Sequence, residues 1–147
     1  MAQPIATDAL ATNVYPYLQL ANSNLFMVRG DTFIKAWYVS QNGSAYNLTG
    51  NSGIRFTAKW RPSDPDSAAV FSYTSAPNVV VTSATGGLIT TTISPAATRS
   101  LAGSTSPDSV VPIILVYDLQ VTDSSSNVFT VAIGQLQVMP DISIAVP

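Results

Sequence analysis

The sequence predicts an all-β protein built as an antiparallel β-sandwich, and three observations lead to this fold class. Short runs rich in Val, Ile, Thr, Tyr and Phe are separated by turns containing Gly, Asn, Ser or Pro, at spacings typical of a sandwich. All eight acidic residues are Asp and only two residues are Lys, so the usual occupants of exposed helical positions are scarce. No long helical pattern alternates with the strands, which argues against a parallel sheet of βαβ units.

The composition describes one domain whose stability comes from a hydrophobic core. The chain has 147 residues, 46% hydrophobic and 10% charged, with no cysteine, so it fits a single domain without a disulfide or thiolate-metal framework. The net charge of −2 offers no basic field for nucleic acid or an anionic membrane. No apolar run is long enough to cross a bilayer. We therefore expect a protein made in the cytoplasm, with no nucleic-acid and no membrane partner.

Residues 1–24 are expected to form an extended arm that precedes the sandwich domain, residues 25–147. The arm is rich in Ala, Thr, Asn and Pro and carries one apolar patch at residues 14–20. The fixed φ of Pro16 and its missing N–H disfavour a helix there. Two interpretations stay open: a tail lying on its own domain, or an arm docking on a neighbouring subunit. In the second case the subunit-docking residues are Tyr15, Tyr17, Leu18 and Leu20.

The sandwich is expected to begin with strands at residues 25–28 and 32–39, joined by a bulge or turn at Gly30. The Arg-Gly-Asp tripeptide around Gly30 matches a cell-adhesion motif, but it lies between two strands and not on a long exposed loop. A structural role is therefore favoured for it. Asn42-Gly43 readily supplies the positive φ of a hairpin turn, after which residues 46–49 are expected to form a brief strand.

The strand expected at residues 54–60 alternates between apolar and polar residues. Successive side chains of a strand point to opposite faces of the sheet, so one face of this strand should be buried and the other exposed. Residues 61–67 are expected to form a loop, and residues 68–73 to continue the sheet. The residues expected inward are Ile54, Phe56, Ala58 and Trp60, and those expected outward are Arg55, Thr57 and Lys59.

Residues 79–82 and 88–93 are two further expected strands, and the one helical signature of the chain follows them. Ser94 is a suitable N-cap, Pro95 a suitable first helical residue and Gly103 a terminator. One or two helical turns are therefore expected across an end of the sandwich.

Residues 112–138 are expected to form the hairpin around which the sandwich is organised. Two apolar runs flank the polar cluster at 122–127, which is typical of a hairpin with a longer loop. Because Ile114 and Val116 make the second face of the first arm apolar near its start, we expect this arm to lie centrally and to be covered there on both faces. Residues 139–147 are expected to form an edge strand or a second arm. The residues expected on the core face of the first arm are Ile113, Leu115, Tyr117, Leu119 and Val121.

Eight or nine strands of this kind favour an immunoglobulin-like sandwich, with one short helix and the N-terminal arm added to it. A jelly roll is the alternative arrangement.

Residues able to catalyse a reaction or to hold a metal are scarce. The chain has no histidine and no cysteine, which removes the usual general base, zinc ligands and Ser-His-Asp triads. Asp64 and Asp66 flank Pro65, and Asp-Pro-Asp is ordinary turn chemistry. Calcium binding at this loop is a weak hypothesis, because the Asp-x-Asp-x-Asp-Gly spacing is missing. We therefore expect no enzyme, with no catalytic residues, no metal and no cofactor.

Three further patterns admit both a functional and a structural interpretation. Gly86-Gly87 lacks the Lys and the helix of a phosphate-binding loop. The triplet at 47–49 (NLT) matches a glycosylation acceptor, but it is more simply explained as a loop that ends a strand. Trp37 and Trp60 could stack on sugar rings; both lie on apolar strand faces, so packing in the core or in an interface is favoured.

Several short motifs follow one another in order between residues 25 and 142. They are RGDTF at 29–33, YNLTG at 46–50, FTAKW at 56–60, VYDLQV at 116–121 and VAIGQLQV at 131–138. In this order they resemble small β-sandwich proteins of tailed bacteriophage virions, in particular the N-terminal domain of baseplate upper proteins. The resemblance implies an immunoglobulin-like fold and a structural role in a virion, with no catalytic residues.

The sequence ends at Pro147, without the coiled-coil or receptor-binding extension that a baseplate adaptor usually carries. We therefore expect a capsid decoration, or cement, protein that stabilises the head by bridging subunits. A tail or baseplate adaptor subunit and a receptor- or glycan-binding module are the alternatives. Low charge and apolar segments at both ends suit a part whose surface meets neighbours. The expected location is the virion, the expected partners are the major capsid protein or tail proteins, and the expected state is a homo-oligomer such as a trimer.

Overall fold

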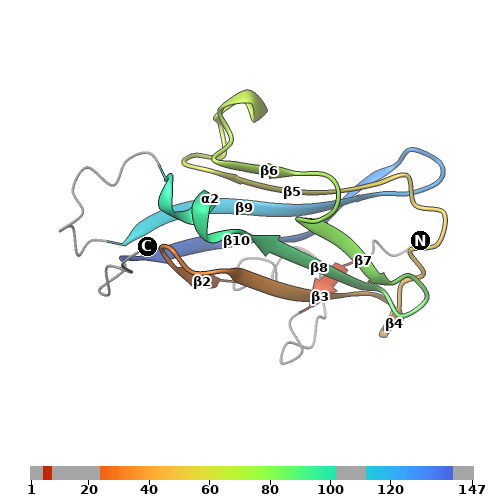
Figure 1. Ribbon diagram of the computed structural model, residues 1–147. Helices are drawn as coiled ribbons and strands as arrows, with labels where there is room; N and C mark the ends of the chain where they lie inside the picture. Colours follow the sequence, from red (N-terminus) through yellow and green to blue (C-terminus); the bar gives the residue numbers. More distant parts are fainter. Residues whose placement is uncertain (1–4, 8–23, 102–111, 141–147) are drawn as a thin grey trace.

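The computed structural model describes residues 5–7, 24–101 and 112–140, which form two stacked β-sheets (Figure 1). The first sheet has the strand order β1-β3-β8-β7, with the short β4 paired to β3. Every pair of strands in this sheet is antiparallel. Its strands are β1 (Ile5–Thr7), β3 (Phe33–Gln41), β4 (Ser44–Ala45), β7 (Val79–Ser83) and β8 (Leu88–Ile93).

The second sheet has the strand order β2-β10-β9-β5-β6. Its pairs are antiparallel except for the edge strand β2, which runs parallel to β10. The all-β sandwich predicted from the sequence is therefore confirmed. The strands of this sheet are β2 (Leu25–Val28), β5 (Gly53–Lys59), β6 (Phe71–Tyr73), β9 (Ile113–Thr122) and β10 (Val128–Met139).

The predicted hairpin of β9 and β10 is confirmed. Its register runs from Val128 opposite Thr122 to Val138 opposite Ile113, with a bulge near Thr130. The connecting loop is closed by Asp123, whose carboxylate accepts hydrogen bonds from the backbone N–H groups of Ser125 and Asn127. Strand β9 lies between β10 and β5, so it is central in the sheet.

The core fills the space between the two sheets and is built from alternate residues of their strands. Four of the five core-face residues predicted for β9 are buried, and the fifth, Ile113, is half-buried against the core. The Tyr117 ring lies between those of Trp37 and Phe56, at centroid distances of 5.8 and 5.7 Å. The indole N–H of Trp37 donates a hydrogen bond to the buried Thr91 hydroxyl, at 3.0 Å, so the polar atom of this large side chain is satisfied.

The second face of β9 differs from the prediction. Ile114 is 49% exposed, so the apolar start of this face is not covered as expected. Central position and cover on both faces are separate properties, because hydrogen bonding to β10 and β5 places the strand centrally while its outer face stays open.

Two strand predictions need correction. Residues 46–49 are irregular and not a strand: the Tyr46 N–H donates to the Val39 carbonyl and the Leu48 N–H to the Ala84 carbonyl, so this segment crosses towards the β7–β8 hairpin. Strand β5 ends at Lys59, so Trp60 leaves the sheet and is 39% exposed instead of pointing inward. Beyond it the chain forms the 3-10 turn η1 (Asp66–Ala68) before β6, which is shorter than predicted.

The predicted helix is confirmed as α2 (Pro95–Arg99), and its end differs from the expectation. The Ser94 hydroxyl caps it by accepting the N–H of Ala97. The helix ends at Arg99, with Ser100 as its C-cap, and not at Gly103, which lies outside the described residues. The side chain of Leu101 is buried, so the chain turns back into the core as soon as the short helix has crossed the end of the sandwich.

The predicted N-terminal arm is described only in part. Ile5–Thr7 pairs antiparallel with Tyr38–Ser40 of β3. The docking residues predicted in the arm, Tyr15, Tyr17, Leu18 and Leu20, lie outside the described residues, as does the segment after residue 140.

Candidate docking surface

The outer face of the second sheet carries a strip of exposed apolar side chains. Phe26 of β2 is aligned with Gln137 of β10, which is aligned with Ile114 of β9, and Val28 is aligned with Met139. Aligned residues of neighbouring strands share a face, so these side chains lie together on the side turned away from the core. The apolar strip, as we call it, consists of Phe26, Val28, Ile114, Ile133 and Met139.

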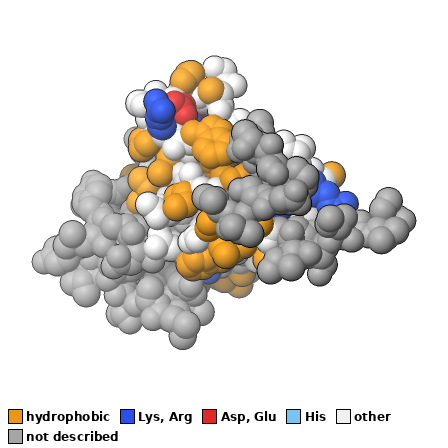
Figure 2. All heavy atoms as spheres, turned by 90° about the vertical axis from the view of Figure 1, so that its left-hand side faces the viewer, with side chains coloured by type: hydrophobic (Ala, Val, Ile, Leu, Met, Phe, Trp, Pro, Cys, Tyr) orange, Lys and Arg blue, Asp and Glu red, His pale blue; other side chains and the backbone are white. Residues whose placement is uncertain are grey.

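The exposure of the apolar strip is large for residues of these types. Phe26 is 62% exposed, Ile114 49% and Ile133 44%. Figure 2 looks onto the end of the sandwich where α2, β2 and the end of β10 lie, and hydrophobic side chains gather in the middle of this view. Exposed apolar side chains that gather on one face often mark a site of contact with another molecule.

Next to the strip, a groove of about 220 Å³ lies on the same outer face, above β5, β9 and β10. Arg55, Thr57 and Lys59 project outward from β5, as the alternation of this strand predicts. Thr57 is nevertheless buried, because it lies at the bottom of the groove. Residues of β9 and β10, among them Asp118 and Ile133, also line the groove, and another wall is formed by Pro62 and Asp66 of the β5–β6 connection, which rises above the sheet (Figure 1).

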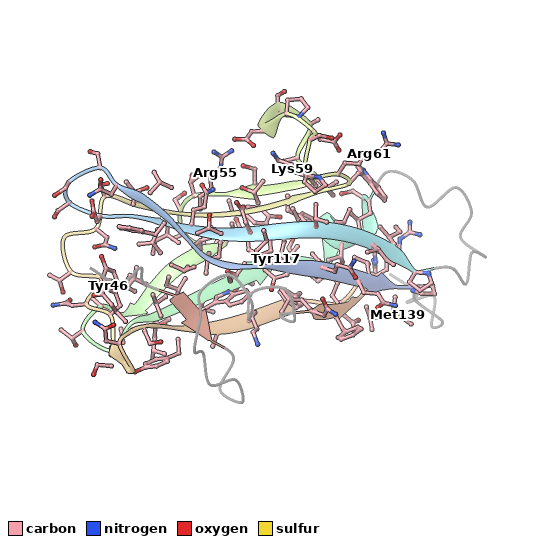
Figure 3. All side chains as sticks on the ribbon, turned by 180° about the vertical axis from the view of Figure 1, so that it is seen from behind. Tyr46, Arg55, Lys59, Arg61, Tyr117 and Met139 are labelled. Carbon is pink, nitrogen blue, oxygen red and sulfur yellow. The ribbon has the colours of Figure 1, made fainter. Side chains whose placement is uncertain are left out.

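Asp66 holds the two cations of β5 in place. Its carboxylate oxygens lie 2.6 Å from Lys59 Nζ and 3.0 Å from an Arg55 guanidinium nitrogen. Lys59 Nζ also donates to the Asp64 carbonyl at 2.9 Å. The hydrogen bond from Lys59, together with the charges of Arg55 and Lys59, lowers the pKa of Asp66. Figure 3 shows Arg55 and Lys59 on the same side of β5, below the connection that carries Asp66.

Asp118 of β9 lies in a different environment within the same groove. One of its oxygens accepts a hydrogen bond from Gln120 Nε2 at 2.9 Å. Burial raises the pKa of Asp118, against the opposing effect of the positive charges on Lys59 and Arg55. This carboxylate is therefore poorly solvated, and a hydrogen-bond donor brought into the groove would stabilise its charged form.

The Asp-Pro-Asp loop has a structural role in these contacts. Besides the ion pairs of Asp66, the Asp64 carboxylate accepts the backbone N–H of Arg61 at 3.0 Å. No group of three or more potential metal ligands occurs among the residues that the structure describes. The arrangement gives no support to the calcium hypothesis.

The Arg-Gly-Asp tripeptide is tied to α2. The Gly30 N–H donates to the Thr98 hydroxyl at 2.9 Å, Arg29 donates to the Arg99 carbonyl at 3.1 Å, and the Asp31 carbonyl accepts from Thr98. These bonds hold the turn after β2 against the helix, so the structure gives this tripeptide the structural role that the sequence favoured.

The two tryptophans have different environments. Trp37 is buried in the core, whereas Trp60 borders a second hollow of about 250 Å³ between the β5–β6 connection and α2. Small side chains surround it there, among them Ala68, Ala97 and Ser100. Of the two candidates for sugar stacking, only Trp60 presents ring surface to solvent.

Sequence reasoning missed the apolar strip and the groove as sites. The signal for the strip was present, because Phe26 and Val28, like Ile114 and Val116, are apolar pairs two residues apart and so share a face. The groove depends on the register of β5, β9 and β10 and on the fold of the β5–β6 connection, which no local pattern reveals.

A comparison with models of known protein families gives no match, and neither does a comparison with curated proteins. In the part of the chain that the structure describes, no helix has the length and apolar character needed to span a membrane.

Proposed function

We propose that this chain is a structural protein of a tailed bacteriophage virion, most simply a capsid decoration or cement protein that stabilises the head by bridging subunits. The observation that carries the proposal is the outer face of the second sheet, where the apolar strip lies beside a groove of fixed charges. Such a surface suits a subunit of a larger protein assembly, whether its neighbour on this face is another protein or a second copy of the chain. The ordered motifs that resemble phage β-sandwich proteins are the reason for proposing a phage virion as the assembly.

The strand order supports the immunoglobulin-like interpretation of the fold. Setting aside β2 and β4, the strands in chain order correspond to A, B, C, C′, D, E, F and G. The first sheet then has the order A-B-E-D and the second G-F-C-C′, which is the arrangement of immunoglobulin-like sandwiches. Strand β2 extends the second sheet beside G. This fold is compatible with many functions, so it supports the virion role only together with the motifs.

Immunogold electron microscopy of phage particles tests the proposal. Antibody against the recombinant chain should label the head of the particle if the chain is a cement protein. Label confined to the tail tip would favour the tail or baseplate adaptor instead. Particles without label, from a lysate in which the chain is detected by blotting, would refute a virion role.

The predicted docking residues allow a second test. Ile5–Thr7 forms part of the first sheet, so deleting the whole N-terminal segment would damage the sandwich. Replacing Tyr15, Tyr17, Leu18 and Leu20 by Ser leaves the backbone intact. We expect this variant to fold normally by circular dichroism and to be lost from particles. Normal incorporation would remove these four residues from the proposal.

A receptor- or glycan-binding module is the second candidate, and the position of Trp60 favours it. An exposed indole beside a hollow can stack on a sugar ring. A glycan array with the wild-type chain and with Trp60→Ala would test this function. Glycan binding that is lost in the variant would support the binding module. An array without signal would leave the structural role as the remaining proposal.

A further inference from the structure

The outer face of the second sheet is one continuous surface with two parts. In the apolar strip, Phe26 and Ile114 lie on either side of Gln137, and Ile133 is aligned with Asp118 in the neighbouring strand. Ile133 and Asp118 both line the groove, so the strip and the groove meet there. A partner that covers the strip would therefore also cover Asp118.

The charges of this surface restrict the kind of partner that fits it. The groove contains two cations, Arg55 and Lys59, and two carboxylates, Asp66 and Asp118. A strongly basic or strongly acidic partner would be attracted by one of these pairs and repelled by the other, so its charge would bring little net gain. A partner whose contact surface is apolar and carries charges of both signs can place each charge opposite one of the other sign.

A second copy of the chain has such a surface. The net charge of −2 on 147 residues means that two copies repel each other only weakly, and salt screens that repulsion beyond about 8 Å at physiological ionic strength. Arg61 is exposed, and its guanidinium forms no ion pair with any described residue. Figure 3 shows it pointing away from the sheet near Lys59. In a pair of copies it would offer hydrogen-bond donors to the carboxylates of the other copy.

We propose that the outer face of the second sheet is a self-association surface, on which a second copy of the chain packs its own outer face. The same surface then serves both copies, so the contact is isologous and relates them by a two-fold axis. The apolar strip of one copy covers that of the other, and the grooves close against each other. A two-fold pair differs from the trimer expected from the sequence. The inference stands independently of the virion role.

Matched substitutions on the two sheets test this proposal. Ile114 on β9 and Ile34 on β3 are exposed isoleucines on the outer faces of opposite sheets, 49% and 65% exposed. Ile114→Glu places an unpaired carboxylate in the proposed contact, whereas Ile34→Glu makes the same change outside it. Sedimentation equilibrium from micromolar to submillimolar concentration measures the dissociation constant of each variant.

We expect the wild type and Ile34→Glu to form dimers with similar dissociation constants. Ile114→Glu should weaken association by at least about 30-fold, as does truncation of a residue that dominates an interface. Phe26→Ser on the same strip should also weaken it, and its 62% exposure in the single chain keeps the fold intact if Ile114→Glu destabilises the sandwich. Circular dichroism checks the fold of each variant.

Three results would overturn the proposal: a wild-type chain that stays monomeric over the whole concentration range, a dimer that Ile34→Glu weakens as much as Ile114→Glu does, or a trimer that none of these substitutions affects. A chain that dimerises as expected but is absent from phage particles would refute the virion role and keep this inference.

Discussion

The hydrogen bond between Trp37 and Thr91 allows a stringent test of how the core is held together. The indole N–H and the hydroxyl are 3.0 Å apart, and both side chains are buried. Thr91→Val keeps the shape of the side chain and removes the acceptor, so the Trp37 N–H stays buried without a partner. Leaving a buried donor unsatisfied costs about 1–3 kcal/mol. We expect the free energy of unfolding to fall by that amount and Tm to fall by about 3 °C per kcal/mol.

The control for this experiment lies next to Thr91 on β8. Thr92 points to the opposite face and is half-buried, so Thr92→Val makes the same chemical change without touching the hydrogen bond. Urea denaturation followed by far-UV circular dichroism gives the free energy of unfolding of both variants. We expect Thr92→Val within about 0.5 kcal/mol of the wild type. If Thr91→Val is no less stable than Thr92→Val, the hydrogen bond does not stabilise the core and the reasoning is wrong.

Three further predictions follow from single residues. Acrylamide should quench the fluorescence of Trp60, which is 39% exposed, and spare that of the buried Trp37. The variant Trp60→Phe should therefore show only fluorescence that resists quenching. Strong quenching in this variant would contradict the burial of Trp37. Gly87→Ala should destabilise the fold by more than 2 kcal/mol in urea denaturation, because the φ of Gly87 is +67° and a Cβ there would lie 2.4 Å from the Val39 carbonyl oxygen. Gly43→Ala is the control: open space surrounds Gly43, so this substitution should cost about 1 kcal/mol. Equal losses of stability in the two variants would count against this account. Burial raises the pKa of Asp118 above its value in the unfolded chain, so the contribution of Asp118 to stability is present at low pH and is lost as the pH rises through the folded pKa. Thermal melts should therefore show Asp118→Asn more stable than the wild type at pH 7 and no more stable at pH 3. A variant less stable than the wild type at pH 7 would reverse the sign we assign.

The parts of the fold that could be predicted are those in which a local pattern coincides with the final packing. Along the ten residues of β9, side chains on the core face alternate with side chains on the outer face. Asn42-Gly43 provides the positive φ angles that the turn between β3 and β4 adopts. Trp60 and residues 46–49 were predicted wrongly for one reason. Both look like strand in isolation, but strand structure requires a hydrogen-bonded neighbour, and at these points the chain leaves its sheet.

The candidate surface was less predictable than the fold. The apolar character of Ile114 and Val116 is visible in the sequence, where it predicts cover by another part of the same chain. A sequence pattern shows that a face is apolar, but it does not show whether the covering group is intramolecular or belongs to another molecule. The groove could not be predicted, because Asp66 and Asp118 are brought together with Lys59 only by the strand register and the fold of the β5–β6 connection.

Self-association and attachment to a particle require separate surfaces. If two copies cover each other's apolar strip, that face cannot also hold the chain on a capsid, so the attachment must use other residues. The predicted docking residues around Tyr17 are then the natural candidates, and their replacement by Ser should abolish incorporation while leaving the dimer unchanged. Ile114→Glu should abolish the dimer in solution and give a monomer. Whether this monomer is still incorporated into particles would show whether dimerisation contributes to attachment. If the arm substitutions also prevent dimerisation, the arm contributes to self-association, and the outer face of the second sheet is not sufficient by itself.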